Sequence, residues 1–433
     1  MPESSPARPV DAGERVLLLD VLRGFALGGV FVSNAYMHLS GNGLLPRERG
    51  QALKASWWDA TADFLFEQLL AGKAMALFSF LFGLGFAVQL GRAEARGASI
   101  VRVYSRRLGV LLLIGLLHRF ALWYGDVLAM YAVTGFALLL FRGLPHRNLL
   151  VWGLALIFGG SLAVSAVLKL VPLWASSPDV VRDFAQENMA HSRLIRAQTL
   201  AAFQSGDYLT MARANLDFSL SFTFRPLQVS HMLVTLGRFL LGLLAGRLLL
   251  FQDVERHRPL FRRLFGWGLG AALVGSVAGW LIPRLLKSGT LPSSLNLPWR
   301  VIQPSIWELS VLGLAAVYAA GLSLLFVRPR WRRGLSLLAP AGQMALTNYL
   351  SQTVISQFVF YGYGFSLMGK LGAASCLALM SGLFAVQVPL SHLWMARFRF
   401  GPVEWLWRTL TYGQRQPMRR PSKHPTRDMA PTA

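Results

Sequence analysis

Ten runs of mostly apolar residues, each close to the length of a membrane-spanning helix, constrain this chain more than any other feature. A helix needs about 20 residues to cross the hydrocarbon core of a bilayer. It also satisfies its own backbone hydrogen bonds, which lipid cannot do. We therefore predict an all-α fold, a polytopic transmembrane helical bundle of about ten spans. The expected spans cover residues 17–37, 64–90, 107–124, 127–141, 149–172, 227–250, 263–283, 302–326, 335–360 and 371–395.

The composition supports lipid as the solvent of this chain. Of its 433 residues, 54% are hydrophobic and only 15% are charged, whereas about a quarter of the residues in a soluble domain are charged. Cys376 is the only cysteine, which excludes an intramolecular disulfide and zinc binding by several thiolates. We accordingly expect no metal site.

The formal charge of +23 comes largely from short Arg clusters between the apolar runs. Positive side chains accumulate in the cytoplasmic connections of membrane proteins. Each cluster follows an even-numbered run, so we predict that both termini are cytoplasmic. The pattern argues against a nucleic-acid partner, which needs a solvated basic face, and favours membrane lipids with anionic headgroups. The clusters are Arg92, Arg96, Arg102, Arg106 and Arg107; Arg142 and Arg147; Arg256, Arg258, Arg262 and Arg263; Arg328, Arg330, Arg332 and Arg333; and Arg415, Arg419, Arg420 and Lys423.

The polar segments define the domain organisation. Residues 1–14 read as a disordered cytoplasmic tail, and residues 15–400 as a single transmembrane bundle. Within the bundle, residues 173–225 place apolar side chains at helical spacing among charges, which predicts one or two amphipathic helices on the outer face. Residues 401–433 read as a cytoplasmic interfacial segment and tail.

Ionisable and polar groups within the spans are costly, so each is a candidate for function. Asp20 and Arg23 are three residues apart and share one helical face near the cytoplasmic boundary. They suit either a structural ion pair or an inner-face site. Asn34 suits either a polar site near the outer end or a helix–helix contact.

An acidic stripe precedes the second span. Asp59, Asp63 and Glu67 are spaced by four residues, and Lys73 follows within the apolar stretch. A lysine inside the membrane needs a partner, which this stripe could supply. The alternative is a solvated acidic face beside a lysine that extends its charge to the interface.

His118 and Asp126 form the most informative pair. His118 lies in the outer half of the third span, and Asp126 follows in a tight turn before the fourth. An imidazole beside a carboxylate is the usual general-base arrangement, because the carboxylate fixes the tautomer. A buried polar pair that fastens the hairpin is the alternative, and spacing alone favours it.

Three further spans carry polar side chains. Arg238 and Glu308 lie in different spans and could pair across the bundle. In the ninth span, Asn348 belongs to a polar face that suits either substrate contact or hydrogen bonding between helices. The other members of that face are Gln343, Thr347, Tyr349 and Gln352.

Several segments carry distinctive motifs along nearly the whole chain. They are RVLLLDVLRGFALGGVFVSN, GKAMALFSFLFGLGFAVQ, LLIGLLHRFALWYGDVLAMYAV, GQMALTNYLSQ and GPVEWLWRTLTYGQRQPMRR. Together they resemble the YeiB-like family of bacterial inner-membrane proteins. This resemblance implies a multi-pass protein of the bacterial inner (plasma) membrane.

The opening LDVLRG and the apolar helix after it are more distantly similar to membrane acyltransferases of the heparan-glucosaminide acetyltransferase type. In that type, a histidine before an Ala-Ser-Trp run acts in catalysis. Lys54 stands at that position here, which puts catalysis by this position in doubt. The aspartate and arginine of the opening motif in that type correspond to Asp20 and Arg23 here. The resemblance also implies a role for Asp63.

The hypothesis that combines these features is transfer of an acyl group from a cytoplasmic donor to an outer-face glycan or lipid acceptor. Acyl-CoA would be the donor substrate, with no permanently bound cofactor. The alternatives are a transporter or exporter of a small or lipid-linked solute, and a non-catalytic membrane scaffold. The expected catalytic residues are His118, Asp126 and Asp63, and the expected binding residues are Asp20, Arg23, Asn34, Lys73 and Asn348.

Overall fold

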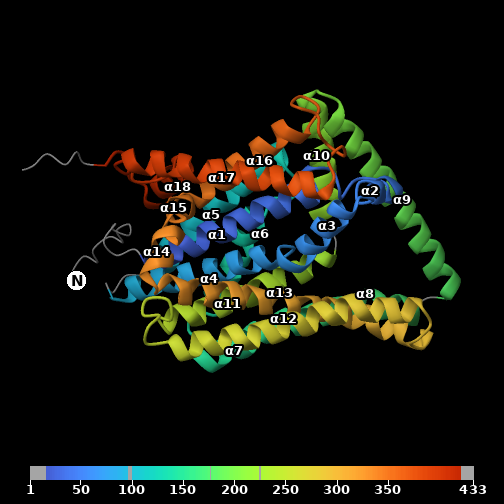
Figure 1. Ribbon diagram of the computed structural model, residues 1–433, viewed down its shortest axis with the longest axis horizontal. Coiled ribbons are helices and arrows are strands. Elements are labelled where there is room, and N and C mark those ends of the chain that lie inside the picture. The colour runs from blue at the N-terminus through green and yellow to red at the C-terminus, as the bar shows by residue number, and fades with distance from the viewer. Residues whose placement is uncertain (1–15, 96–99, 176, 224–225, 421–433) are drawn as a thin grey trace, which may run out of the picture.

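The fold is helical throughout the part of the chain that the structure describes, residues 16–95, 100–175, 177–223 and 226–420 of a computed structural model. Figure 1 shows long helices packed side by side along the longest axis. In chain order the elements are α1 (Leu17–Asn34), η2 (Ala35–Leu39), α2 (Arg47–Ala52), α3 (Trp57–Leu69), α4 (Lys73–Ala95), α5 (Ile100–Leu117), η3 (His118–Leu122), α6 (Leu128–Leu140), α7 (His146–Leu154), η4 (Ala155–Gly160), α8 (Ser161–Ala175), α9 (Pro178–Gln204), α10 (Tyr208–Thr223), α11 (Pro226–Arg247), α12 (Arg258–Lys287), η5 (Ser293–Leu295), α13 (Asn296–Phe326), α14 (Pro329–Ser336), α15 (Ala339–Gln343), α16 (Ala345–Phe360), α17 (Ala373–Arg397) and α18 (Pro402–Tyr412).

Seven helical segments among the described residues are long and apolar enough to cross a membrane. The chain is therefore a multi-pass helical membrane protein. Three expected spans are not among the seven. The run at 127–141 forms the shorter helix α6, the run at 107–124 shares α5 with cationic side chains, and the run at 335–360 is divided among α14, α15 and α16. The count of ten spans stays a prediction.

The two ends of the bundle differ. Figure 1 places α14 and α18 at one end, and α2, α3 and α10 at the other. The segment 173–225, expected to contain one or two amphipathic helices, folds into two, α9 and α10. The interfacial segment after residue 400 forms α18. The tail expected at 1–14 lies outside the described residues.

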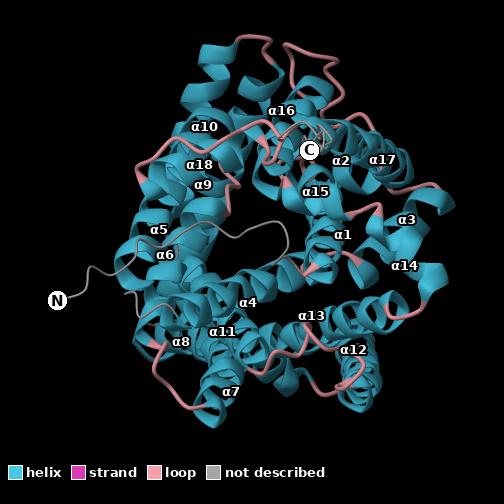
Figure 2. Ribbon diagram, turned by 90° about the vertical axis from the view of Figure 1, so that its left-hand side faces the viewer, coloured by secondary structure: helices cyan, strands magenta, loops and turns pink. Residues whose placement is uncertain are grey.

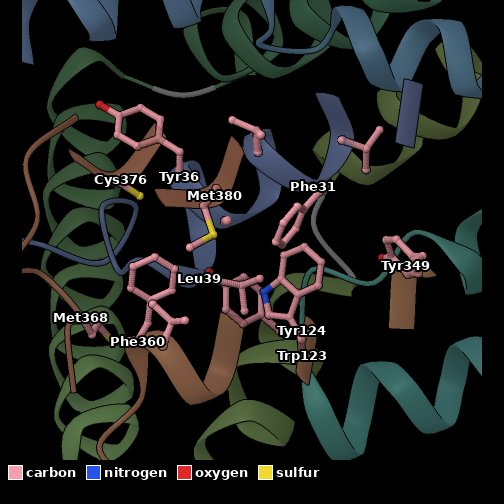
Figure 3. Close-up of a cluster of buried hydrophobic side chains, with 14 of the residues drawn as sticks. Phe31, Tyr36, Leu39, Trp123, Tyr124, Tyr349, Phe360, Met368, Cys376 and Met380 are labelled. Atoms are coloured by element: carbon pink, nitrogen blue, oxygen red, sulfur yellow. The ribbon is translucent and has the colours of Figure 1, made fainter. Parts of the chain in front are cut away.

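Many aromatic side chains are buried in the interior of the bundle. The largest buried cluster joins α1, η2, α16 and α17 to the segment that follows η3, and Figure 3 shows part of it. Phe31, Trp123 and Tyr349 are buried in this cluster. Buried aromatic rings contribute large contact areas and hold their neighbours in fixed positions. The polar segment around His118 is consequently embedded in a tightly packed interior.

Close contacts between helices depend on glycine at specific positions. A Cβ atom at Gly83 of α4 would overlap the backbone carbonyl of Phe239 in α11. A Cβ atom at Gly242 of α11 would likewise overlap the carbonyl of Phe80 in α4. Small residues let two membrane helices approach this closely.

Gly83→Ala is expected to lower the stability of the protein by about 1–3 kcal/mol, because the added methyl group forces α4 and α11 apart. Thermal unfolding of the detergent-solubilised protein measures this effect. Gly91→Ala in the same helix is the matched control, since a Cβ atom there meets nothing within 4 Å. Equal melting temperatures for the two variants would contradict the prediction.

Candidate functional site

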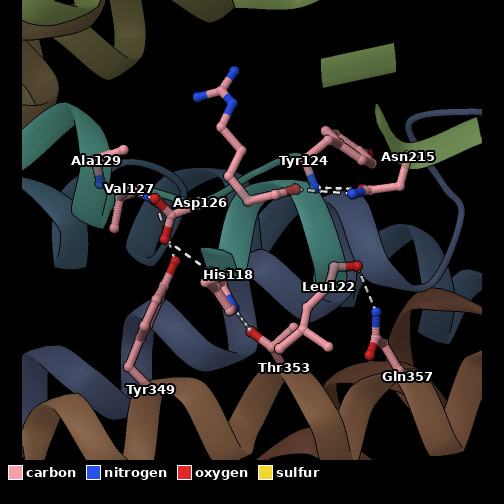
Figure 4. A network of polar contacts seen from close by, with 11 residues as sticks. His118, Leu122, Tyr124, Asp126, Val127, Ala129, Asn215, Tyr349, Thr353 and Gln357 are labelled. Carbon is pink, nitrogen blue, oxygen red and sulfur yellow. Dashed lines mark hydrogen bonds and ion pairs between the residues drawn. The ribbon is translucent and has the colours of Figure 1, made fainter. Parts of the chain in front are cut away.

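His118 is the centre of a buried chain of three side chains (Figure 4). Its Nδ1 lies 2.8 Å from Oδ1 of Asp126, and its Nε2 lies 3.0 Å from the Thr353 hydroxyl. The side chains of His118 and Asp126 are 1% and 0% exposed. The structure therefore brings together the pair expected from the sequence and adds Thr353, which sequence reasoning missed. Thr353 is 235 residues away along the chain, so no local spacing points to it.

Local structure fixes the carboxylate of Asp126. Its second oxygen, Oδ2, accepts a hydrogen bond of 2.8 Å from the backbone N–H of Ala129 in the first turn of α6. This bond satisfies a donor that the helix leaves free and orients the carboxylate toward His118. The histidine itself begins η3, a wider turn that ends α5.

Two other helices hold the segment that follows His118. The side chain of Asn215 in α10 accepts a hydrogen bond from the backbone N–H of Tyr124 and donates to the carbonyls of Arg119 and Phe120. Gln357 in α16 donates to the carbonyl of Leu122 at 2.6 Å. Because these amides satisfy a buried irregular backbone, the geometry around His118 is rigidly specified.

A large cavity of about 740 Å³ runs along the bundle and ends beside this chain of side chains. The helices α1, α4, α5, α6, α11, α15, α16 and α18 contribute its lining, and Figure 2 shows several of them arranged in a ring. Its inner lining includes Val127, which follows Asp126, and Tyr349, whose ring centroid is 5.4 Å from that of His118. Its exposed lining residues include Glu94, near the C-terminal end of α4, and Gln252, in the connection that follows α11.

Arginine and acidic side chains both line the cavity. The arginines are Arg23, Arg92, Arg107, Arg247 and Arg408, and the acidic residues are Asp20, Glu94 and Glu404. Arg23 pairs with Asp20 at 3.0 Å, as the sequence spacing predicted. Arg107 donates to the Gln89 side chain at 3.1 Å and lies 4.0 Å from the ring centroid of Trp407. Among the described residues, Arg107 has no carboxylate at ion-pair distance. Five arginines against three acidic residues give the lining a formal charge of +2 (5 − 3), which attracts an anion.

Glu404 of α18 closes the cavity wall beside α16. Its carboxylate accepts hydrogen bonds from the backbone N–H groups of Leu346 and Thr347 and from the Thr347 hydroxyl, at 2.6, 3.0 and 2.5 Å. These donors lie at the N-terminus of α16, where a carboxylate is favourable. Burial raises the pKa of the Glu404 carboxyl, and the hydrogen bonds from Thr347 oppose that shift. Glu404 therefore fastens α18 to α16.

Asp63 and Lys73 lie apart from the cavity and from His118. Asp63 pairs with Lys54 at 2.7 Å and accepts a hydrogen bond of 2.7 Å from the Tyr36 hydroxyl. Lys54 is therefore the partner of an acid. Lys73 donates to the backbone carbonyl of Glu67 and stacks on the Trp307 ring, so its contact is not the carboxylate that we expected.

Asn348 and Asn34 have different surroundings. Asn348 donates to the carbonyl of Ala341 and to the Ser391 hydroxyl, at 3.1 and 3.0 Å, so it joins α16 to α15 and α17. Asn34 lines a small pocket of about 10 Å³ together with Gln352 and Thr353. No three His, Cys, Asp or Glu side chains within the described ranges gather as a metal site requires.

Comparison with known proteins establishes the family. A family model described as a protein of unknown function (DUF418) matches residues 245–414. YxaH of Bacillus subtilis (strain 168), an uncharacterized protein, is 32% identical over 437 residues, which cover 97% of this chain and 100% of YxaH. The chain belongs to the YeiB-like DUF418 family. This family membership confirms the resemblance drawn from the sequence motifs.

Other members of the YeiB-like family match over similar lengths. The uncharacterized protein YeiB of Escherichia coli (strain K12) is 28% identical over 417 residues, 92% of this chain and 96% of YeiB. A 39.9 kDa protein from the amylase 3′ region of Bacillus acidopullulyticus is 28% identical over 410 residues, 95% of this chain and 97% of that protein. No solved structure matches the chain.

Proposed function

We propose that this protein transfers an acyl group from a cytoplasmic acyl-CoA to a glycan or lipid acceptor at the outer face of the bacterial inner membrane. The observation that supports this function best is one cavity whose lining includes Arg23 and Arg107 near one end and the neighbours of His118 and Asp126 at the other. Acyl-CoA carries anionic phosphates, a flexible arm and a reactive thioester. A cationic entrance and a deep general base are suited to such a molecule.

The expected orientation of the protein in the membrane agrees with a cytoplasmic donor. The cationic clusters after even-numbered spans favour an orientation with the α14 and α18 end and both termini in the cytoplasm, and with ten spans in total. Arg107 and His118 are 11 residues apart on α5 and its extension, or about 16 Å along a helix axis. A donor bound by its phosphates at Arg107 needs an extended arm to reach His118, and acyl-CoA has one.

The chemistry then requires a base and a positive binding site. The carboxylate of Asp126 is a hydrogen-bond acceptor, so Nδ1 of His118 carries the proton and Nε2 is free to accept another. His118 can thus take a proton from a hydroxyl in the step that forms the new ester. Tyr349 lines the cavity, and its hydroxyl accepts a hydrogen bond of 3.3 Å from the backbone N–H of Val127. The hydroxyl hydrogen can then be donated to the thioester carbonyl as negative charge develops.

The direct test uses the purified full chain in lipid nanodiscs with acetyl-CoA and palmitoyl-CoA. The proposal expects saturable binding and release of free CoA, together with loss of acylated surface glycan or lipid when the protein is deleted from its host. A failure to bind either thioester, with no change in surface acylation on deletion, would overturn the proposal. Binding followed by transport of the intact molecule would instead identify an exporter.

Arg107→Met is expected to weaken the binding of CoA by about 10- to 150-fold, because a charged hydrogen bond to phosphate contributes roughly 1.5–3 kcal/mol. Isothermal titration in nanodiscs measures the affinity. Arg106→Met is the matched control: it removes the same charge from the adjacent position of α5, but its exposed side chain does not line the cavity. Equal losses for both variants would show that only the general positive field attracts CoA.

A further inference from the structure

The hydroxyl of Thr353 has an unusual partner for a threonine within a helix. A helical threonine commonly donates to the backbone carbonyl three or four residues earlier. Among the described contacts, Thr353 bonds only to Nε2 of His118, at 3.0 Å. Because Nδ1–H of the same ring donates to Asp126, the lone pair of Nε2 faces the Thr353 hydroxyl and accepts its hydrogen.

An acid, an imidazole and a hydroxyl connected in this order form the arrangement that activates a hydroxyl nucleophile. The carboxylate orients the ring and stabilises the imidazolium, and the imidazole removes the proton of the hydroxyl as it attacks. Here the three groups come from the start of α6, from η3 and from α16. A pair that served only to fasten the α5–α6 hairpin would not need a hydroxyl from α16.

We propose that Thr353 carries the acyl group between donor and acceptor as an ester on its Oγ1, an inference that rests on the acyl-transfer function proposed above. Oγ1 attacks the carbonyl carbon of the acyl-CoA thioester while Nε2 of His118 takes its proton. The carbon–sulfur bond breaks, and the CoA thiolate takes that proton and leaves as the thiol. A hydroxyl of the acceptor, deprotonated by His118, then attacks the ester, and the Thr353 oxygen recovers a proton from the imidazolium.

A small pocket adjoins Thr353, which is not among the residues that line the large cavity. Thr353 lines the small pocket of about 10 Å³, which is close to the volume that one water molecule needs. Gln352 lines the same pocket and is 3% exposed, and its Oε1 has no hydrogen-bond partner among the described residues. A buried acceptor without a partner is costly, so this oxygen is suited to receive a hydrogen bond from an incoming hydroxyl.

One residue is shared by the large cavity and the small pocket. Tyr349 lines both the large cavity and the small pocket. Figure 4 shows its side chain in the same network as His118 and Thr353. Transfer from a donor in the large cavity to Thr353 therefore requires the Tyr349 ring to move aside. The covalent intermediate would separate the donor and acceptor steps on the two sides of this ring.

Trapping the acyl group tests the proposal. Wild-type protein and the Thr353→Ser, Thr353→Val and Ser356→Ala variants are reconstituted in nanodiscs, mixed with acetyl-CoA without acceptor, quenched in acid and digested for mass spectrometry. We expect one acetyl group on the peptide that contains residue 353 in the wild type and in Thr353→Ser, and none in Thr353→Val. Ser356→Ala removes a buried hydroxyl at a neighbouring position of α16 and should be labelled like the wild type.

Release of CoA, measured with a thiol reagent, distinguishes a failure of the role proposed for Thr353 from a failure of the proposed acyl transfer. We expect Thr353→Val to release CoA at least about 10²-fold more slowly than the wild type, with an unchanged melting temperature. Wild-type rates of release in Thr353→Val, or an acetyl group on His118 instead, would overturn the role of Thr353 while acyl transfer itself stood. A wild-type protein that neither binds acetyl-CoA nor releases CoA would overturn both proposals.

Discussion

His118→Gln is expected to lower the rate of CoA release from acetyl-CoA by about 10²- to 10⁴-fold, the range that a positioned general base contributes. The amide of glutamine can still donate a hydrogen bond toward Asp126, but it cannot take up a proton during the reaction. The rate is measured on the nanodisc-reconstituted protein with saturating acetyl-CoA. Affinity for CoA should change little, because the Arg23 and Arg107 end of the cavity is unaltered.

The control for this substitution is His146→Gln, which alters an exposed histidine at the start of α7. Asp126→Asn gives a second, independent measurement. An asparagine amide would donate to Nδ1, which moves the ring proton to Nε2 and leaves no acceptor for the Thr353 hydroxyl. We expect a loss of activity similar to that of His118→Gln. Full activity in either variant, at an unchanged melting temperature, would show that His118 and Asp126 only fasten the hairpin.

Arg238→Met is expected to destabilise the protein by about 3–5 kcal/mol, because it leaves the Glu308 carboxylate buried without its partner. Nη2 of Arg238 lies 2.6 Å from Oε2 of Glu308 and joins α11 to α13. The two side chains are only 9% and 11% exposed. Thermal unfolding in detergent measures the loss as a lower melting temperature.

The double variant Arg238→Met/Glu308→Met distinguishes the loss of the ion pair from the cost of leaving one charge buried without a partner. Replacing both ions with apolar side chains of similar size is often neutral or stabilising, so the double variant should recover most of the loss. Arg182→Met in α9 is the control, since its ion pair with Asp179 is more than half exposed on both sides and such pairs contribute about 0–1 kcal/mol. A single variant as stable as the control would contradict the prediction.

The helical class of the fold could be predicted because it depends on local properties of the chain. Apolar runs near the length of a bilayer core specify helices, and the spacing of Asp20 and Arg23 specifies a shared face, where the structure has an ion pair. The role of the His118–Asp126 pair was left open between a general base and a polar pair that fastens the hairpin, and their spacing did not guarantee contact because a turn lies between them. Their 2.8 Å contact depends on Asn215 and Gln357, which hold that turn from α10 and α16.

The sequence pattern did not identify Arg107 as a residue of the cavity. Its position in a cationic cluster indicated an inner loop, and nothing local distinguished it from the exposed Arg106 beside it. Only the packing of α18 against α5 covers Arg107 with Trp407 and places its guanidinium in the cavity with Arg23. Asp63 and Lys73 are the opposite case. The sequence singled them out as candidate site residues, but they are not among the residues that line the cavity.

By itself, the sequence determined that this protein is a multi-pass bundle of helices, since the length and polarity of each run decide whether it is stable in lipid. It also showed which ionisable groups lie within the apolar runs. The tertiary structure decided which of them meet. The Asp126–His118–Thr353 chain combines residues up to 235 positions apart, and the cavity beside it is lined from eight helices. Such contacts depend on how the helices pack, and the spacing of residues along the sequence does not predict them.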